Sequence, residues 1–171
     1  MKIYLAGSVP KGDKEAEVFD NWRKRYQGLL LAVFPDADFI DPYVREADES
    51  DPLLVAGFDC AHIKTADLVV VHAEEKLGAG TSQELVVAKY FHRPVITVLP
   101  KDSHHRRSNI TFHDVFIKDW THPFIHTFSD FIVERVEDIG KIAPKLATAH
   151  VKDIGIIDEA IEYAERKLKA S

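Results

Sequence analysis

The sequence contains few of the features that mark secreted, membrane-spanning or nucleic-acid-binding proteins. Its one cysteine, Cys60, cannot form an internal disulfide, which fits a reducing cytoplasm. No apolar run approaches the roughly 18 residues of a transmembrane helix, so we expect no membrane span. The formal net charge of −6 argues against general affinity for nucleic acid or anionic membrane. A small anionic ligand is still allowed, because a local site can differ in sign from the whole chain.

The composition is that of an ordinary globular protein, without internal repeats or low-complexity stretches. With 171 residues, 46% of them hydrophobic, the chain is long enough for one domain with a full core, and we expect that domain to cover residues 1–171. Residues 2–6 predict a short strand that runs directly into Gly7 and Ser8, rather than a signal peptide.

Apolar strands and amphipathic helices alternate along the first hundred residues. Residues 43–52 are acidic and irregular, which suggests a lid or rim, and residues 101–124 read as a long polar loop. Alternation of this kind predicts a doubly wound α/β fold: a mainly five-stranded parallel sheet, flavodoxin-like or Rossmann-like, with helices on both faces and extra C-terminal helices. We expect strands at 3–6, 38–41, 68–71, 94–99 and 124–128, and helices at about 13–32, 53–65, 81–91, 130–147 and 153–169.

The segment from Gly78 to Glu84 (GAGTSQE) follows an apolar strand and opens a helix. Gly78 and Gly80 allow a tight turn and close approach of a ligand, and the helix start supplies free N–H groups and partial positive charge. A carboxylate held at the carboxyl end of a parallel sheet lies where ligands bind, and it can act as a nucleophile or pair with a cation. The alternative is a capping box running from Thr81 to Glu84, in which the glutamate only bonds back to its own backbone.

Further polar residues are expected near the carboxyl ends of the strands. Ser8 follows the first strand, and Tyr4 is the one polar group inside it, so its hydroxyl needs a partner. That partner is either an unspecified group in the core or the carboxylate of Glu84. Asp59 reads either as a solvated helix acid or as a second acid at the site, and Asp67 reads as a cap or strand-entry residue.

The histidines and arginines after residue 100 do not define a site. Five of the nine histidines fall within residues 101–126, but their spacing is not that of an established zinc site, and we expect no metal. Arg106 and Arg107 form a solvated pair or contact a phosphate. The loop from Gly7 to Gly12 contains glycine but lacks the spacing of a Walker A motif.

In the order and spacing of its motifs, the chain resembles the nucleoside 2-deoxyribosyltransferase family and the related 2'-deoxynucleoside 5'-monophosphate N-hydrolases. The resemblance covers residues 1 to about 110 and rests on KIYLAGS at 2–8, Asp59 followed by Asp67, GTSQE at 80–84 and RPVITV at 93–98. It implies that Glu84 is the nucleophile that attacks the anomeric carbon and forms a glycosyl ester. It also implies that Asp59 handles the proton on the leaving base and that Tyr4 orients the nucleophile.

The same resemblance implies a substrate pocket shaped by Gly7, Ser8, Gly78 and Gly80, with no metal or organic cofactor. Asn109 falls where the family has an asparagine that reaches into a neighbouring subunit's site, which implies a homo-oligomer. Transferases often carry an acid six residues before the nucleophile, where this chain has Gly78. The hydrolases instead carry a serine at that position, and their first loop has a Gly-Ser pair with a following basic residue, a pattern that Ser8 and Lys11 resemble.

The resemblance therefore implies an enzyme that cleaves the N-glycosidic bond of a 2'-deoxyribonucleoside through a glycosyl ester on Glu84. Trapping the sugar on a carboxylate divides one difficult step into two, as in retaining glycosidases. Transfer of the sugar to a second nucleobase is the leading prediction. The alternatives are hydrolysis of a (deoxy)nucleoside 5'-monophosphate to base and sugar phosphate, and a nucleotide-binding module without catalysis.

Overall fold

The computed structural model describes residues 1–43 and 48–169 of the chain. Part of the predicted lid at 43–52 therefore lies outside the described residues. The sheet has five strands in the order β2-β1-β3-β4-β7, and every neighbouring pair is parallel. Its strands are β1 (Lys2–Ala6), β2 (Asp38–Ile40), β3 (Leu68–His72), β4 (Val95–Val98) and β7 (Phe131–Val133). This is the flavodoxin-like strand order, and it confirms the predicted fold class.

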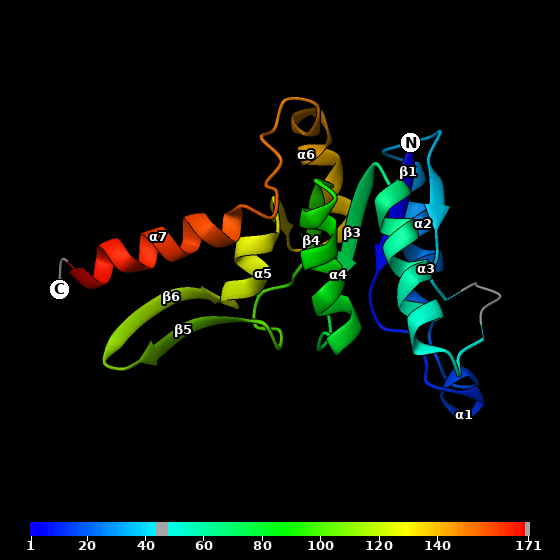
Figure 1. The fold of residues 1–171 in the computed structure, drawn as a ribbon, viewed down its shortest axis with the longest axis horizontal. Helices are drawn as coiled ribbons and strands as arrows, with labels where there is room; N and C mark the ends of the chain where they lie inside the picture. The colour runs from blue at the N-terminus through cyan, green and yellow to red at the C-terminus, as the bar shows by residue number, and fades with distance from the viewer. Residues whose placement is uncertain (44–47, 170–171) are drawn as a thin grey trace.

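Helices cover both faces of the sheet (Figure 1). The helices α3 (Pro52–Thr65), α4 (Ala79–Tyr90) and α5 (Pro123–Phe128) pack on the face that carries Tyr4, Val69 and Val71. The other face carries Ile3, Leu5 and Val70 and is covered by α2 (Trp22–Leu31), the short 3-10 helix η1 (Val136–Asp138) and α6 (Ile139–Leu146). Because β3 is covered on both sides, all five of its residues are buried.

The predicted helix at 13–32 is divided into two. A short helix α1 (Asp13–Ala16) is followed by a break, and α2 begins only at Trp22. Asn21 caps the new helix, because its side chain accepts a hydrogen bond from the backbone N–H of Arg23 at 3.2 Å. This second start places Trp22 and Arg23 in the first turn of α2, beside the carboxyl end of β1.

The chain after Pro100 differs most from the sequence prediction. The expected loop at 101–124 is mainly an antiparallel hairpin of β5 (Arg106–Phe112) and β6 (Val115–Thr121). The expected strand at 124–128 is the helix α5, with Pro123 in its first turn and Ile125 and Phe128 facing the core. The fifth strand is instead β7, and the predicted helix at 130–147 is reduced to η1 and α6.

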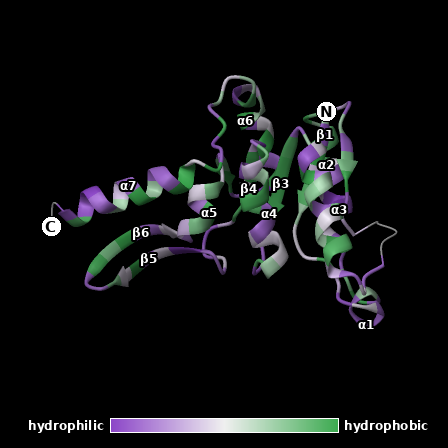
Figure 2. Cartoon of the chain, viewed as in Figure 1, coloured by the Kyte–Doolittle hydropathy of each residue, from purple (hydrophilic) through white to green (hydrophobic). Residues whose placement is uncertain are grey.

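The last helix, α7 (Ile156–Lys169), and the hairpin both extend away from the sheet (Figure 1). Apolar and polar residues alternate along α7 (Figure 2), and none of its described residues is fully buried. Among the described residues no helix is long and apolar enough to cross a membrane.

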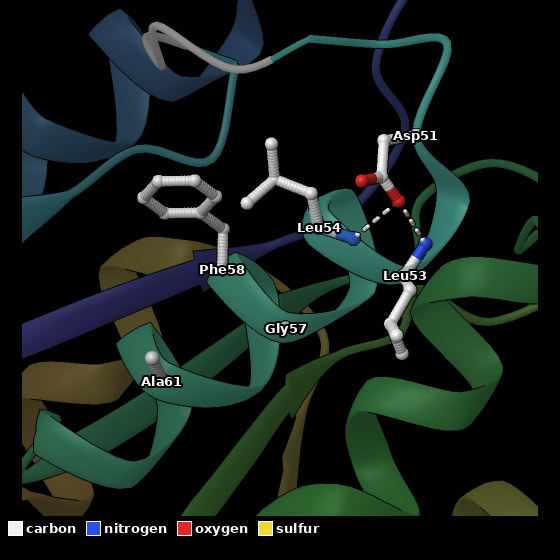
Figure 3. Close-up of a pocket in the computed structure, with 6 residues that line it drawn as sticks. All are labelled: Asp51, Leu53, Leu54, Gly57, Phe58 and Ala61. Carbon is white, nitrogen blue, oxygen red and sulfur yellow. Dashed lines mark hydrogen bonds between the residues drawn. The ribbon is translucent and has the colours of Figure 1, made fainter.

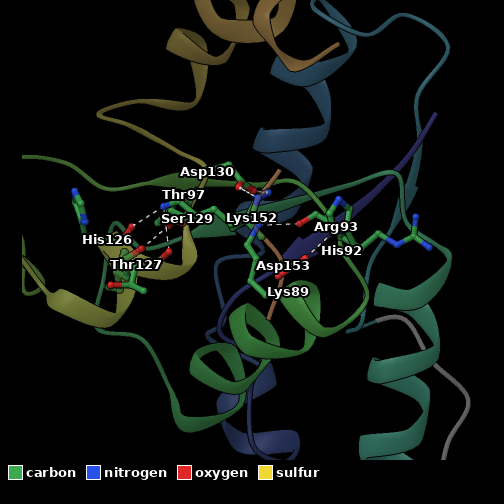
Figure 4. Close-up of polar contacts among 12 residues, drawn as sticks. Lys89, His92, Arg93, Thr97, His126, Thr127, Ser129, Asp130, Lys152 and Asp153 are labelled. Carbon is green, nitrogen blue, oxygen red and sulfur yellow. Dashed lines mark hydrogen bonds and ion pairs between the residues drawn. The ribbon is translucent and has the colours of Figure 1, made fainter. Parts of the chain in front are cut away.

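A polar network joins the start of this C-terminal segment to the sheet (Figure 4). The ammonium group of Lys89 pairs with Asp130 in the core and also donates to the carbonyl of Arg93 at 3.0 Å. Asp130 accepts the backbone N–H of Lys152, whose side chain donates to the carbonyls of Thr127 and Ser129 at 3.1 and 2.6 Å. Lys152 therefore satisfies the last carbonyls of α5 and fixes where the chain leaves the body of the protein.

Candidate active site

The candidate site lies at the point in the sheet where the strand order reverses. β1 pairs with β2 on one side and with β3 on the other, so the connections that follow these strands leave toward opposite sides. In open α/β sheets the crevice at such a point is the usual ligand site. The side chains that meet there come from β1, α3 and α4.

Tyr4 and Glu84, which are 80 positions apart in the chain, are in direct contact. The phenol of Tyr4 is fully buried and donates a hydrogen bond of 2.6 Å to Oε1 of Glu84. The capping-box alternative for Glu84 is wrong, because α4 begins at Ala79 with Gly78 as its N-cap. Glu84 therefore lies in the second turn of the helix, where its side chain extends to the sheet instead of the helix start.

Burial and negative charge together keep Tyr4 protonated. Burial is the largest cause of its raised pKa, followed by the charge of Glu84, the hydrogen bond to Glu84 and the charge of Asp59. The protonated phenol is therefore the donor in its hydrogen bond to Glu84. Asp59 is half-buried on α3, and its charge acts on both Tyr4 and Arg23, so the structure brings it to the same site.

Gly7 and Ser8 form the turn that follows β1 on the same edge of the sheet. A Cβ atom at Gly7 would lie 2.5 Å from Cζ2 of Trp22 and 3.1 Å from Cβ of His72, so only glycine fits there. Gly78 and Gly80, which were expected to allow a tight turn, differ from Gly7. A Cβ at either position meets nothing within 4 Å, and neither has a positive φ, so the structure gives no steric reason for glycine at these two positions.

Two residues of this edge were missed by the sequence analysis. Arg23 is fully buried and donates to three backbone carbonyls, those of Leu5, Gly7 and Ser8, at 3.2, 2.9 and 2.9 Å. His72 ends β3 and stacks on Trp22 with ring centroids 4.3 Å apart. Arg23 follows a tryptophan in the helix predicted at 13–32, but no local pattern indicates that its side chain reaches back to β1.

The remaining predicted residues lie elsewhere. Asn109 is exposed on β5, with φ of 53°, on the hairpin that extends from the sheet. Arg106 is held by a two-bond ion pair with Asp119 at 2.9 and 2.6 Å, so it is not free to contact a phosphate. Asp67 accepts the backbone N–H of Lys2 at 2.7 Å, which agrees with its reading as a strand-entry residue.

The histidine-rich segment forms a cluster of its own between α4 and α5. His105 accepts the backbone N–H of Leu77 at 2.9 Å, and burial lowers its pKa to about 4, with smaller contributions from its neighbours. A cavity of about 390 Å³ between α4 and α5 is lined by His105 and His122 among mainly apolar side chains. In the part of the chain that the structure describes, no three histidine, cysteine or acidic side chains are grouped to hold a metal ion.

Two larger hollows flank the site. One of about 600 Å³ lies beyond β1 and β2 and is lined by Lys11, Pro42, Tyr43 and Glu49 among others. The second, of about 500 Å³, lies along α3 and is shown in Figure 3, where Leu54, Phe58 and Ala61 follow one another on the helix surface. The first hollow adjoins the turn after β1 and has room for part of a ligand, whereas the second is an apolar groove.

Comparisons with known proteins identify relatives by structure only. No protein-family model matches the chain, and no curated protein sequence matches it. A 2-deoxyribosyltransferase from Bacillus psychrosaccharolyticus aligns with a TM-score of 0.55 and 18% identity, over 90% of this chain and 98% of the other. A 2-deoxyribosyltransferase from Leishmania mexicana aligns with a TM-score of 0.55 and 15% identity, over 86% and 97%. At these identities the likeness shows a shared fold over nearly the whole length of both enzymes.

A third solved structure, the CMP N-glycosidase BcmB from Clostridium botulinum, is less similar. It aligns with a TM-score of 0.47 and 17% identity, over 85% of this chain and 98% of the other. That score is too low to add to the argument about the fold.

Proposed function

We propose that this protein cleaves the N-glycosidic bond of a 2'-deoxyribonucleoside and transfers the sugar to another nucleobase. The observation that carries the proposal is the hydrogen bond between Tyr4 and Glu84 at the reversal point of the sheet. The sequence motifs at these positions and the fold shared with two 2-deoxyribosyltransferases support the same reading. Fold alone does not define function, so the site residues and their chemistry are decisive.

The proposed reaction has two displacements at the anomeric carbon. The carboxylate of Glu84 attacks C1' while the bond from C1' to the base nitrogen breaks, and the bonding electrons leave with the base. Asp59, when protonated, supplies the proton that makes the base a better leaving group. A second base then attacks C1', gives its N–H proton to the now ionised Asp59 and displaces the carboxylate, so the configuration at C1' is retained overall. Tyr4 holds one carboxylate oxygen, which leaves the attacking group in one orientation.

Hydrolysis of a nucleoside 5'-monophosphate is the second candidate, favoured by one observation. Lys11, a cation that could pair with a phosphate, lines the 600 Å³ hollow that adjoins the turn after β1. The hollow also has Asp13 and Glu49 in its wall, and these acids disfavour a phosphate. Incubation with a deoxynucleoside or its 5'-monophosphate, each with and without a free base, separates the two activities by their products. Free sugar phosphate indicates hydrolysis, and a new nucleoside indicates transfer.

We also propose that the protein works as a homo-oligomer in which Asn109 completes the site of a neighbouring copy. Asn109 is exposed on a hairpin that extends from the sheet (Figure 1), which is the arrangement that such a contribution requires.

Substitution of the nucleophile tests the proposed function. We expect Glu84→Gln to lower base exchange by about a thousandfold or more, because the amide cannot form the glycosyl ester. The matched control is Glu75→Gln, which alters an exposed acid in the loop before α4 and should exchange bases like the wild type. Peptide mass spectrometry of wild type mixed with substrate should find one deoxyribosyl group on Glu84. Full exchange by folded Glu84→Gln would refute the assignment, and ligand-induced thermal stabilisation without turnover would indicate a binding module instead.

A further inference from the structure

The Arg23 side chain lies where α2 meets the carboxyl edge of the sheet. It has no exposed surface, which is unusual for arginine unless its charge and donors are satisfied. Its Nη1 and Nη2 donate to the carbonyls of Ser8 and Gly7, and its Nε lies 3.2 Å from both the Leu5 carbonyl and Oδ1 of Asp41. The guanidinium also stacks on the Trp22 ring, 4.4 Å from its centroid.

These contacts hold the end of β1 and the turn that follows it. The Gly7 and Ser8 carbonyls lie past the last residue of β1, so no neighbouring strand supplies their hydrogen bonds. A planar guanidinium can satisfy several converging acceptors in one fixed geometry, whereas an ammonium group cannot reproduce that pattern. Removing the guanidinium would leave these carbonyls without their donors and free the turn to move.

The same side chain places a positive charge among the acids of the site. Four groups from four segments act on it: Asp41 after β2, Glu84 on α4, Tyr4 on β1 and Asp59 on α3. His72 on β3 is also within range of this charge. Buried charges interact strongly because little water screens them. The cation therefore favours the ionised form of Glu84, and the proposed nucleophile must be ionised to attack.

We propose that Arg23 is a positioning residue of the active site: it fixes the turn at Gly7 and Ser8 and favours the charged form of the Glu84 carboxylate. This inference rests on the proposed function, because it assigns Arg23 a part in the reaction of Glu84. Arg23 touches the turn and Asp41, and it acts on the reaction through them. It has two separable properties, the planar donor fork and the charge.

Two substitutions separate these properties. Arg23→Lys keeps the charge but loses the fork, so KM should rise while the acidic limb of the pH profile of kcat/KM stays in place. Arg23→Met loses both, so KM should rise and the acidic limb should also move to higher pH, by roughly one unit, since Glu84 loses a neighbouring opposite charge. The matched control is Arg25→Met, which alters an exposed arginine on the same helix and should keep both the KM and the pH profile.

A limb that stays in place in folded Arg23→Met would overturn the charge role, and an unchanged KM in both variants would overturn the fork role. If Arg23→Met does not fold, Asp41→Asn gives the same test with the opposite sign. It keeps Arg23 but removes the carboxylate that offsets its charge, so the acidic limb should move to lower pH. An unmoved limb in Asp41→Asn would count against the proposal.

A readout without turnover keeps this inference distinct from the proposed function. The backbone amide resonances of Gly7 and Ser8 should move in Arg23→Lys and remain in place in Arg25→Met. If the wild type turns over no nucleoside or nucleotide while these resonances move as expected, the proposed function fails and the anchoring role of Arg23 stands. If the resonances do not move, the anchoring role fails even in an active enzyme.

Discussion

At the scale of single residues, His72 is a buried imidazole whose surroundings keep it neutral. It is 6% exposed and lies between the rings of Trp22 and Tyr26, with Nε2 3.7 Å from Glu74. Burial is the main cause that lowers its pKa to about 4, and it outweighs the opposing effect of Glu74. The imidazole therefore serves as an apolar stacking surface under the turn at Gly7.

This lowered pKa makes the stability of the fold depend on pH. When the pH falls below about 6.5, His72 takes up a proton in the unfolded chain but not in the folded protein until about pH 4. The stabilisation is thus complete above pH 6.5 and is lost between 6.5 and 4, by about 3 kcal/mol at most. Urea titrations at pH 7 and pH 4.5 measure how much free energy of unfolding is lost on acidification. We expect this loss to be smaller in His72→Phe than in the wild type.

The control for this measurement is His150→Phe, because His150 is exposed. That variant should keep the wild-type pH dependence. His105 remains in both variants, and burial lowers its pKa as well, so part of the acid sensitivity will persist. An equal loss of stability in His72→Phe and in the wild type would show that His72 does not contribute.

At the scale of elements, Gly7 lies where the end of β1 packs against α2. Of the glycines in the described part of the chain, it leaves the least room for a Cβ atom. The nearest side-chain atoms to a Cβ at Gly7 belong to Trp22 and His72, which stack on each other and have little room to move. We expect Gly7→Ala to lower the free energy of unfolding by about 1–3 kcal/mol, the usual cost of overpacking a core. Urea unfolding measures this change.

A glycine on α3 provides the opposite case. A Cβ at Gly57 meets nothing within 4 Å, and the residue lies inside a helix. Gly57→Ala should therefore raise the free energy of unfolding by up to about 1 kcal/mol, the helix propensity difference between the two residues. If Gly7→Ala also raises the free energy of unfolding, the packing argument for Gly7 is wrong, and if Gly57→Ala lowers it, the helix-propensity argument for Gly57 is wrong.

The elements that the sequence predicts well are those that are buried. The strands at β1, β3 and β4 show as apolar runs because helices cover them on both faces. The hairpin of β5 and β6 was missed because none of its residues belongs to the two buried clusters, so it lacks the long apolar run that marks a covered strand. Its turn contains His113 and Asp114, both with positive φ, which is a conformation more typical of asparagine and glycine.

The error at 124–128 arose from composition. Phenylalanine, isoleucine and threonine favour strands, but the proline at position 123 starts a helix, and the two buried residues are three positions apart. The parallel topology explains why the proximity of Tyr4 and Glu84 could be predicted, because the carboxyl ends of β1 and β3 lie at one edge of the sheet. The contacts of Arg23 could not be predicted, because they depend on a helix break at Asn21 that the amphipathic pattern of residues 13–32 conceals.

At the scale of the whole molecule, the C-terminal third exposes apolar side chains far from the core. Phe112 and Phe116 on the hairpin are 57% and 65% exposed, and Ile161 and Leu168 on α7 are 52% and 77% exposed. Both elements extend away from the sheet, and apolar positions recur along α7 (Figure 2). Surfaces of this kind mark protein–protein contacts, which agrees with the proposed homo-oligomer.

The oligomer can be tested by removing this apolar surface. We expect the wild type to sediment as an oligomer and the double variant Phe112→Ser, Phe116→Ser to sediment as a monomer, since the hairpin loses the apolar area that another copy would bury. The control is Leu53→Ser, which alters an 83% exposed leucine of the apolar groove on α3 (Figure 3). Dissociation by the control alone would place the interface on α3, and a monomeric wild type would exclude the proposal.

Shared sites make a sharper test than assembly, because they predict recovery of activity. If each site combines Glu84 of one copy with Asn109 of another, Glu84→Gln and Asn109→Ala are each inactive alone. In a mixed dimer one site carries both substitutions and the other carries neither. An equal mixture after exchange of subunits should therefore regain about a quarter of wild-type base exchange, since half of the random dimers have one intact site of two. A mixture no more active than its components would show that Asn109 acts within its own chain or not at all.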